Sequence, residues 1–221
     1  MAGMTIAAQV EEMRRNGPAE PDPRMAPFAR EQAALAQAVA PATVAALGTV
    51  LPDAELLDAE GAPRALSAVL GAAPAVLVFY RGAWCPYCNI ALRTYQGELS
   101  AALRERGVGL VAVSPQKPDG SLSMQEKNDL DLAVLSDPGQ ALASALGIVT
   151  APTPESVEAQ LGLGLDLTEV NADGTTGLPL PTVAIVGPDR AVRWLDVRPD
   201  YTARTEPEEI LAALDRLEEP A

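Results

Sequence analysis

Two cysteines three residues apart, Cys85 and Cys88, constrain the fold of this chain more than any other feature. An apolar run at residues 75–80 precedes them and predicts a strand buried on both faces of a sheet. A helical pattern follows, from Pro86 to about residue 106. The pair therefore stands where a buried strand ends and a helix begins.

This position favours thiol chemistry. The first turn of a helix carries unpaired N–H groups and the positive end of the helix dipole, which stabilise a thiolate. A cysteine in such a setting can titrate at about 3.5–7.5 instead of about 8.5. Pro86 suits the first turn, where its missing N–H would have had no partner. When one sulfur has attacked a disulfide or been oxidised, the other can close a disulfide within one helical turn.

Two other interpretations of the pair stay open at this point. A spacing of three arises in roughly one random placement in a hundred, and such a pair would be an inert part of the core. A structural zinc site needs four ligands, of which Cys85 and Cys88 would supply two. Redox use fits the position best, and we expect no metal and no cofactor.

The charge of the chain excludes several partners and mechanisms. Its 221 residues carry a net charge of −14, with 16 Lys and Arg residues and no histidine. Nucleic-acid grooves and anionic membrane surfaces need clustered basic side chains, so we expect neither partner. Without histidine, a histidine-based nucleophile triad or general base is impossible. Catalysis has to use thiols, carboxylates, tyrosines or the backbone.

The first ten residues lack both the basic start and the apolar stretch of a signal peptide. No run approaches the ~18 apolar residues that a membrane helix requires. Two cysteines are also too few for a secreted disulfide scaffold. We therefore expect a soluble, cytoplasmic protein.

The order of predicted elements indicates an α/β fold with a central mixed β-sheet flanked by helices. Buried strands at 75–80 and 108–114, joined by a helix, favour parallel pairing, whereas the turn at 187–190 favours an antiparallel hairpin. The last helix should begin at Thr205 and Glu208, which have capping-box spacing. The other predicted elements are strands at 51–58, 132–135, 182–186 and 191–197 and helices at 66–70, 123–130 and 140–146.

Two segments are expected to lie outside this core. Residues 1–48 read as a helical N-terminal extension with a Pro-rich break at 17–23, and residues 49–221 as the main domain. Within the domain, residues 151–178 are rich in Pro, Gly and Thr and resemble an inserted loop, with a short helix near 155–161. Such loops often border a functional site.

The segment Phe79-Tyr80-Arg81-Gly82-Ala83-Trp84-Cys85-Pro86-Tyr87-Cys88 resembles the active-site segment of peroxiredoxin-like proteins of the alkyl hydroperoxide reductase/thiol-specific antioxidant (AhpC/TSA) family. The similarity extends over roughly residues 50–218 and includes Leu135-Ser136-Asp137-Pro138, which resembles the family's LSDP turn. The resemblance implies an extended thioredoxin-like fold and a thiol peroxidase that is re-reduced by a thioredoxin- or glutathione-type partner.

The resemblance also assigns positions to the two cysteines. The family uses a Thr-x-x-Cys motif, in which the cysteine attacks peroxide with the support of an arginine near the start of a later strand. Cys88 then matches the attacking cysteine, and Cys85 stands in place of the threonine. Leu180-Pro181 precedes the strand at 182–186 where that arginine would be, so we predict that the arginine is missing.

Four further residues are candidates for supporting roles. Arg81 could supply a cation near the thiolate, or simply pair with a surface carboxylate. Trp84 and Tyr87 could shape an apolar contact surface, or only fill space. Pro181 resembles the cis-proline of thioredoxin folds, which faces the redox cysteines; an ordinary trans proline is the alternative.

Three functions are compatible with these residues. The first is a thiol peroxidase acting on hydrogen peroxide or organic hydroperoxides. The second is a thiol-disulfide oxidoreductase acting on protein or glutathione disulfides, with Cys85 as the attacking thiolate. The third is a non-catalytic redox sensor. The apolar helical extension makes a homodimer an additional expectation.

Overall fold

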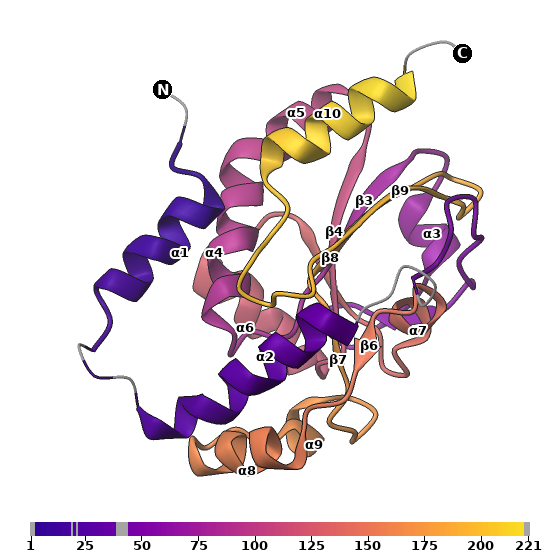
Figure 1. Cartoon of the computed structure of the whole chain (residues 1–221). Helices are drawn as coiled ribbons and strands as arrows, with labels where there is room; N and C mark the ends of the chain where they lie inside the picture. The colour runs from indigo at the N-terminus through magenta and orange to yellow at the C-terminus, as the bar shows by residue number, and fades with distance from the viewer. Residues whose placement is uncertain (1–2, 19, 21, 39–43, 219–221) are drawn as a thin grey trace.

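The computed structural model describes residues 3–18, 20, 22–38 and 44–218. At its centre is a seven-stranded sheet in the order β2-β1-β5-β4-β3-β8-β9 (Figure 1). These strands are β1 (Glu55–Leu57), β2 (Pro63–Ala65), β3 (Ala75–Phe79), β4 (Gly109–Ser114), β5 (Ala133–Ser136), β8 (Thr182–Val186) and β9 (Val192–Val197). A separate two-stranded ribbon pairs β6 (Val149–Thr150) with β7 (Leu178–Pro179).

Helices cover both faces of the sheet. On one face lie α1 (Ile6–Arg15), α4 (Pro86–Thr94), α5 (Ser100–Glu105), α6 (Pro118–Asn128) and α10 (Pro207–Glu218). On the other lie α3 (Leu66–Leu70) and α7 (Ala141–Ala145). The remaining helices are α2 (Ala26–Ala38), α8 (Pro154–Gly162) and α9 (Leu167–Val170), with a 3₁₀ turn at Pro23–Met25.

The central strand β3 explains why the sheet is mixed. It pairs in parallel with β4 and antiparallel with β8, and each of its five residues is buried. Val76 and Val78 pack toward α4, whereas Leu77 and Phe79 pack toward α3 and α7. An apolar run with no polar alternation suits a strand that is covered on both sides. The predicted α/β fold with a central mixed sheet is confirmed.

Several element boundaries differ from the prediction, among them the helix predicted at 123–130, which begins at Pro118 and ends at Asn128. The first strand is only Glu55–Leu57, because the Asp53 carboxylate before it accepts hydrogen bonds from the N–H and hydroxyl of Ser67. The helix predicted from Pro86 to about residue 106 widens into a π-helical turn at Tyr95–Leu99 between α4 and α5.

A further difference concerns the cap of the last helix. Glu209, not Glu208, accepts from the backbone N–H of Glu206 at 2.8 Å, so the capping-box spacing begins one residue later than predicted. The hydroxyl of Thr205 instead donates to Asp196 at 2.7 Å, which ties the start of α10 to β9.

The N-terminal helices pack against the rest of the chain, α1 along α4 and α2 along α8 (Figure 1). Residues 1–2, 19, 21 and 39–43 of the predicted extension lie outside the described residues. The boundary at residue 48 and the status of 151–178 as an insertion stay predictions. Within the described part of the chain, no helix combines the length and apolarity needed to cross a membrane.

Candidate active site

The two cysteines lie at the junction of β3 and α4. Cys85 is the N-cap of α4 in an extended conformation, and Pro86 is its first helical residue. The backbone N–H groups of Cys88 and Asn89 both reach the carbonyl of Cys85, at 3.1 and 3.2 Å. Both cysteines are free thiols, with 1% of Cys85 and none of Cys88 exposed. The chain thus holds a reduced dithiol in the first turn of a buried helix.

The loop before the cysteines is held by Gln116, which follows β4. Its side-chain oxygen accepts from the N–H of Ala83 at 2.6 Å. Gly82 has φ +155°, and a Cβ at this position would lie 2.9 Å from Cδ of Gln116 and closer still to the indole of Trp84. Only glycine fits here without moving one of these neighbours.

Two buried amides fix the other side of the turn. The Asn89 side chain donates to the carbonyls of Ala83 and Cys85, at 2.9 and 2.8 Å. Asn128 of α6 in turn donates to the Asn89 oxygen at 2.6 Å. Hydrogen bonds therefore connect the cysteine turn to α6 and to Gln116 after β4, so the turn is preorganised.

A buried arginine approaches the sulfurs from the segment between β9 and α10. Arg204 Nη2 lies 3.1 Å from Cys88 Sγ and 3.9 Å from Cys85 Sγ, and only 8% of the residue is exposed. No carboxylate among the described residues forms an ion pair with Arg204. A buried guanidinium normally needs a counter-ion, and the anion within reach is a thiolate.

The surroundings shift the pKa values of the two thiols in opposite directions. Burial opposes ionisation of Cys88, but a hydrogen bond from Cys85, the charge of Arg204 and the backbone N–H of Arg81 outweigh it. Together they hold the pKa of Cys88 well below its ordinary value of 9.0. Burial and the neighbouring Cys88 anion raise the pKa of Cys85. These shifts favour a thiolate at Cys88 and a thiol at Cys85.

The structure agrees with the prediction that no arginine lies just before β8, but another arginine reaches the site. Leu180-Pro181 does precede β8, as the sequence indicated, but Arg204 reaches the thiols from a different part of the chain. No local pattern marks Arg204, because it lies in an irregular segment 116 residues from Cys88. Only the arrangement of β9 and α10 around α4 brings the two together.

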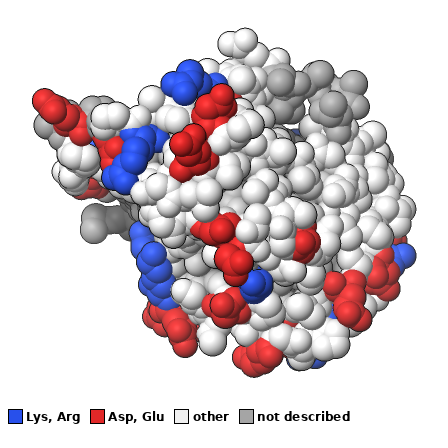
Figure 2. Space-filling view, turned by 90° about the horizontal axis from the view of Figure 1, so that it is seen from below, with Lys and Arg blue, Asp and Glu red and all other residues white. Residues whose placement is uncertain are grey.

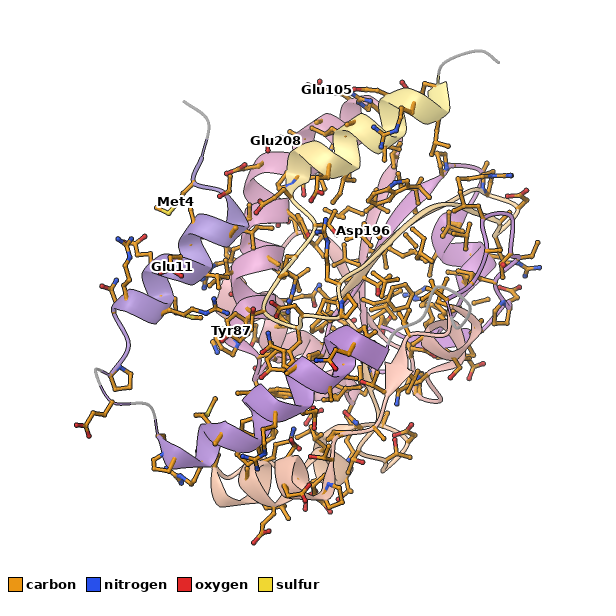
Figure 3. The ribbon with its side chains drawn as sticks, in the orientation of Figure 1. Met4, Glu11, Tyr87, Glu105, Asp196 and Glu208 are labelled. Atoms are coloured by element: carbon orange, nitrogen blue, oxygen red, sulfur yellow. The ribbon has the colours of Figure 1, made fainter. Side chains whose placement is uncertain are left out.

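Arg81 lies among aromatic rings. Its guanidinium carbon is 5.2 Å from the ring centroid of Trp84 and 4.4 Å from that of Tyr201, and the residue is buried. Tyr87 packs against Tyr201, with 6.2 Å between centroids, and lies at the start of α4 on the side toward α2 (Figure 3). Of the two predicted roles of Arg81, the surface ion pair is absent among the described residues, and the guanidinium instead makes cation–π contacts. Its charge also opposes the rise in the pKa of Cys85, as expected of a cation near the thiols.

A mainly apolar cavity of about 420 Å³ opens next to the thiols. Cys85 lines the cavity and Cys88 does not, so Cys85 is the cysteine that the cavity reaches. On the face of the molecule that carries α8, Lys and Arg are scattered among acidic side chains, with a broad uncharged area between them (Figure 2). Besides Cys85, the cavity is lined by Met25, Phe28, Arg81, Trp84, Pro86, Tyr87, Gln160, Leu163, Gly164, Leu165 and Tyr201.

Comparison with known families decides the relationship. The family model described as "AhpC/TSA family" matches residues 47–195. The chain belongs to the AhpC/TSA family. Membership confirms the predicted resemblance and makes the protein an oxidoreductase of the peroxiredoxin type. No curated protein matches the sequence.

Solved structures share the fold of this AhpC/TSA protein at low sequence identity. Peroxidoxin BcpB from Mycobacterium tuberculosis is 22% identical with a TM-score of 0.59, covering 78% of this chain and 98% of its own. Reduced Prx3 from Vibrio vulnificus in complex with hydrogen peroxide is 22% identical with a TM-score of 0.62, covering 77% and 99%. A yeast mitochondrial 1-Cys peroxiredoxin is 15% identical with a TM-score of 0.58, covering 79% and 76%.

The peptide bond before Pro181 of this AhpC/TSA protein is not cis, contrary to expectation. No peptide bond in the described residues is cis, so the predicted cis-Pro181 is wrong. The extended trans chain already satisfies the backbone there, since the N–H of Leu180 donates to Ile148 and the carbonyl of Pro181 accepts from Arg198. Pro181 also does not line the cavity at the thiols.

Among the residues described, no group of three or more metal-ligating side chains lies together.

Proposed function

We propose that this protein is a cofactor-free thiol peroxidase that reduces hydroperoxides with the Cys85/Cys88 dithiol. The observation that carries the proposal is the contact between Arg204 and Cys88, at 3.1 Å in a buried site where no carboxylate of the described residues pairs with the guanidinium. A thiolate, not a thiol, attacks the O–O bond, and this arrangement favours the thiolate.

In the first step, the Cys88 thiolate attacks the terminal oxygen of the hydroperoxide. An S–O bond forms, the O–O bond breaks, and the departing alkoxide takes the proton of the Cys85 thiol. Arg204 is placed to stabilise the charge that moves onto the oxygens. Because Cys88 does not line the cavity, the Cys85 side chain has to turn aside to admit the peroxide.

In the second step, the Cys85 thiolate attacks the sulfur of the Cys88 sulfenic acid. The S–S bond forms, and the leaving hydroxide takes a proton from solvent to give water. One hydroperoxide and one solvent proton are consumed, and one alcohol, one water and the disulfide are produced.

The disulfide is then reduced by an external thiol. Cys85 lines the cavity and is the sulfur such a thiol would attack, while the low pKa of Cys88 makes it the better leaving group. In the yeast mitochondrial 1-Cys peroxiredoxin the thiol is resolved via glutathione and thioredoxin systems, which supports a reductant of this chemical kind.

The cavity indicates the class of hydroperoxide. Hydrogen peroxide is small and polar and gains little from an apolar cavity of 420 Å³. A hydroperoxide with an apolar body would gain about 0.8 kcal/mol for each buried CH₂ group. We therefore propose organic hydroperoxides as the better substrates, with hydrogen peroxide also accepted.

Serine substitutions at the two cysteines test this proposal against its alternatives. Cys85→Ser should still form a sulfenic acid at Cys88 in one turnover with cumene hydroperoxide, because serine keeps a hydroxyl beside the thiolate. Cys88→Ser should lose this reaction by at least about 1,000-fold. A dimedone label followed by mass spectrometry measures both.

Other outcomes identify the other functions. Retention of peroxide reactivity by Cys88→Ser alone would assign the attack to Cys85. Insulin disulfide reduction by the wild-type protein, with no peroxide consumption, would establish a disulfide oxidoreductase. Slow oxidation of the Cys85/Cys88 dithiol, with no turnover in the peroxide or insulin assay, would identify the protein as a redox sensor.

A further inference from the structure

The side chain of Arg204 is held by the segment that carries it. Its Nη1 donates to the carbonyls of Tyr201 and Ala203, at 2.5 and 2.6 Å, while Nη2 points to the sulfurs. The guanidinium is therefore fixed to the backbone of residues 200–206, which lie in the segment between β9 and α10. Any displacement of this segment would move the positive charge relative to Cys88.

The N-terminal helix α1 binds one end of this segment through Glu206. The Glu206 carboxylate accepts hydrogen bonds from the backbone N–H groups of Ile6 and Ala7, at 2.8 and 2.9 Å. These N–H groups belong to the first turn of α1 and have no partner within the helix. A carboxylate at this end of a helix is stabilised by both the hydrogen bonds and the helix dipole.

The same helix and its successor bind the other end of the segment. Arg14, in the last turn of α1, donates to the hydroxyl of Thr202 at 2.7 Å. This hydroxyl bonds the Asp200 carboxylate at 2.7 Å, and Gln32 of α2 donates to the same carboxylate oxygen at 2.5 Å. Arg204 thus lies between two anchoring points, both supplied by the N-terminal helices.

Helix α1 is also fixed to the helix that carries the cysteines. Ile6 and Val10 are buried in the core cluster that includes α4, and Gln9 donates to Thr94 of α4 at 3.0 Å. Figure 1 shows α1 lying along α4, close to the start of α10. One helix therefore contacts both the thiol-bearing element and the arginine-bearing segment.

We propose that helix α1 is a positioning element for Arg204, holding residues 200–206 so that the guanidinium meets Cys88. Glu206, Arg14 and Thr202 are the residues through which it acts. None of the three lies within residues 47–195, the part of the chain that the family model covers. The proposal deepens the proposed function, but it can be tested without peroxide.

Replacement of Glu206 distinguishes positioning from a simple effect of charge. Glu206→Gln removes a negative charge, and if that charge acted only through space its loss would lower the pKa of Cys88. If Glu206 positions Arg204, its replacement weakens the anchoring of the segment and raises this pKa. We expect an upward shift of about one unit, and a fall of up to about 10-fold in thiolate reactivity at neutral pH.

The measurement is the pH dependence of Cys88 alkylation by iodoacetamide, made in full-length protein with Cys85→Ser. Glu208→Gln is the matched control, since Glu208 lies two residues after Glu206, in the first turn of α10 (Figure 3), and has no bond to α1 among the described residues. Arg14→Ala and Arg15→Ala form a second pair, because only Arg14 donates to Thr202. Arg14→Lys should restore the wild-type profile in part.

Two results would overturn the proposal. In the first, Glu206→Gln gives the same pH profile of Cys88 alkylation as the Glu208→Gln control, but a lower melting temperature. Helix α1 would then be a purely structural element. The other is a downward shift, which would make Glu206 only a nearby charge. Because alkylation needs no peroxide, an inactive peroxidase would leave this readout intact and would count against the proposed function alone.

Discussion

The guanidinium of Arg204 and the sulfur of Cys88 meet at 3.1 Å inside the protein, although 116 residues separate them in sequence. Within the described chain, neither group has another partner of opposite charge there: the residues that raise the pKa of Arg204 are Cys88, Cys85 and Tyr95. The charge of Arg204 therefore favours the thiolate of Cys88, together with hydrogen bonds from Cys85 and from the backbone of Arg81.

Removal of this cation should disable the thiolate. Arg204→Gln keeps a hydrogen-bond donor of similar reach but no charge, so the pKa of Cys88 should rise and the first-turnover rate with cumene hydroperoxide at pH 7 should fall by about 100-fold. Stopped-flow tryptophan fluorescence follows the reaction. Arg193→Gln, which breaks an exposed ion pair with Asp189, should react at the wild-type rate. Equal rates for both variants would refute the role of Arg204.

The stability of the reduced protein should depend on pH through Cys88. Folding lowers the pKa of this thiol from 9.0, so the unfolded chain binds its proton more tightly. The stabilisation is fully present above 9.0 and is lost as pH falls through the folded pKa. Urea unfolding of reduced wild-type protein and Cys88→Ser should give a difference in free energy that grows as the pH rises from the folded pKa of Cys88 toward 9.0. A constant difference would show that Cys88 is not ionised.

The apolar cavity should determine the choice of hydroperoxide. Leu163 lines it and is 43% exposed, whereas Leu161 is 51% exposed and does not line it. Leu163→Asp should lower kcat/KM for cumene hydroperoxide by about 10-fold, since a carboxylate in the wall opposes burial of the aromatic body. Hydrogen peroxide should be affected less than about 2-fold, and Leu161→Asp should change neither. Equal losses with both peroxides would exclude the cavity as the binding site.

The loop before the cysteines should not tolerate a side chain at Gly82. Gly82→Ala places a Cβ 2.9 Å from Gln116 and against Trp84, so we expect a loss of about 1–3 kcal/mol in the free energy of unfolding. Gly97→Ala is the control, because no atom lies within 4 Å of a Cβ there. Gly97 lies in a helical turn, where alanine loses less conformational freedom than glycine on folding, so Gly97→Ala should stabilise the protein by about 0.5–1 kcal/mol. A neutral Gly82→Ala would show that the loop adjusts freely.

Much of the fold could be predicted because it follows from local patterns. Strand β3 is a continuous apolar run, and β8 is apolar after Thr182; strands covered on both faces have this pattern. The Gly187–Arg190 turn determines the antiparallel pairing of β8 with β9. The position of Cys85 and Cys88 at the start of a helix follows from the same kind of local reasoning.

The parts that escaped prediction depend on contacts between distant segments. Thr205 looked like a helix cap, but its hydroxyl is engaged by Asp196 of β9, so the cap moves to Glu206. Arg204 has no distinguishing neighbours in sequence, and its role exists only because α10 returns beside α4. The walls of the cavity come from α2, the end of α8 and the cysteine turn, which no sequence pattern connects.

The ion pair of Arg204 with Cys88 exists only while the dithiol is reduced. When the disulfide closes, the anion disappears and the guanidinium remains buried beside two neutral sulfurs. Oxidation therefore carries an electrostatic cost. Because the reduced form is stabilised in this way, the dithiol/disulfide couple of Cys85 and Cys88 has a more positive reduction potential. A shift of about 30 mV corresponds to ~1.4 kcal/mol. On the proposed mechanism, the arginine that favours the Cys88 thiolate also makes the resulting disulfide easier to reduce, so one charge assists both halves of the cycle.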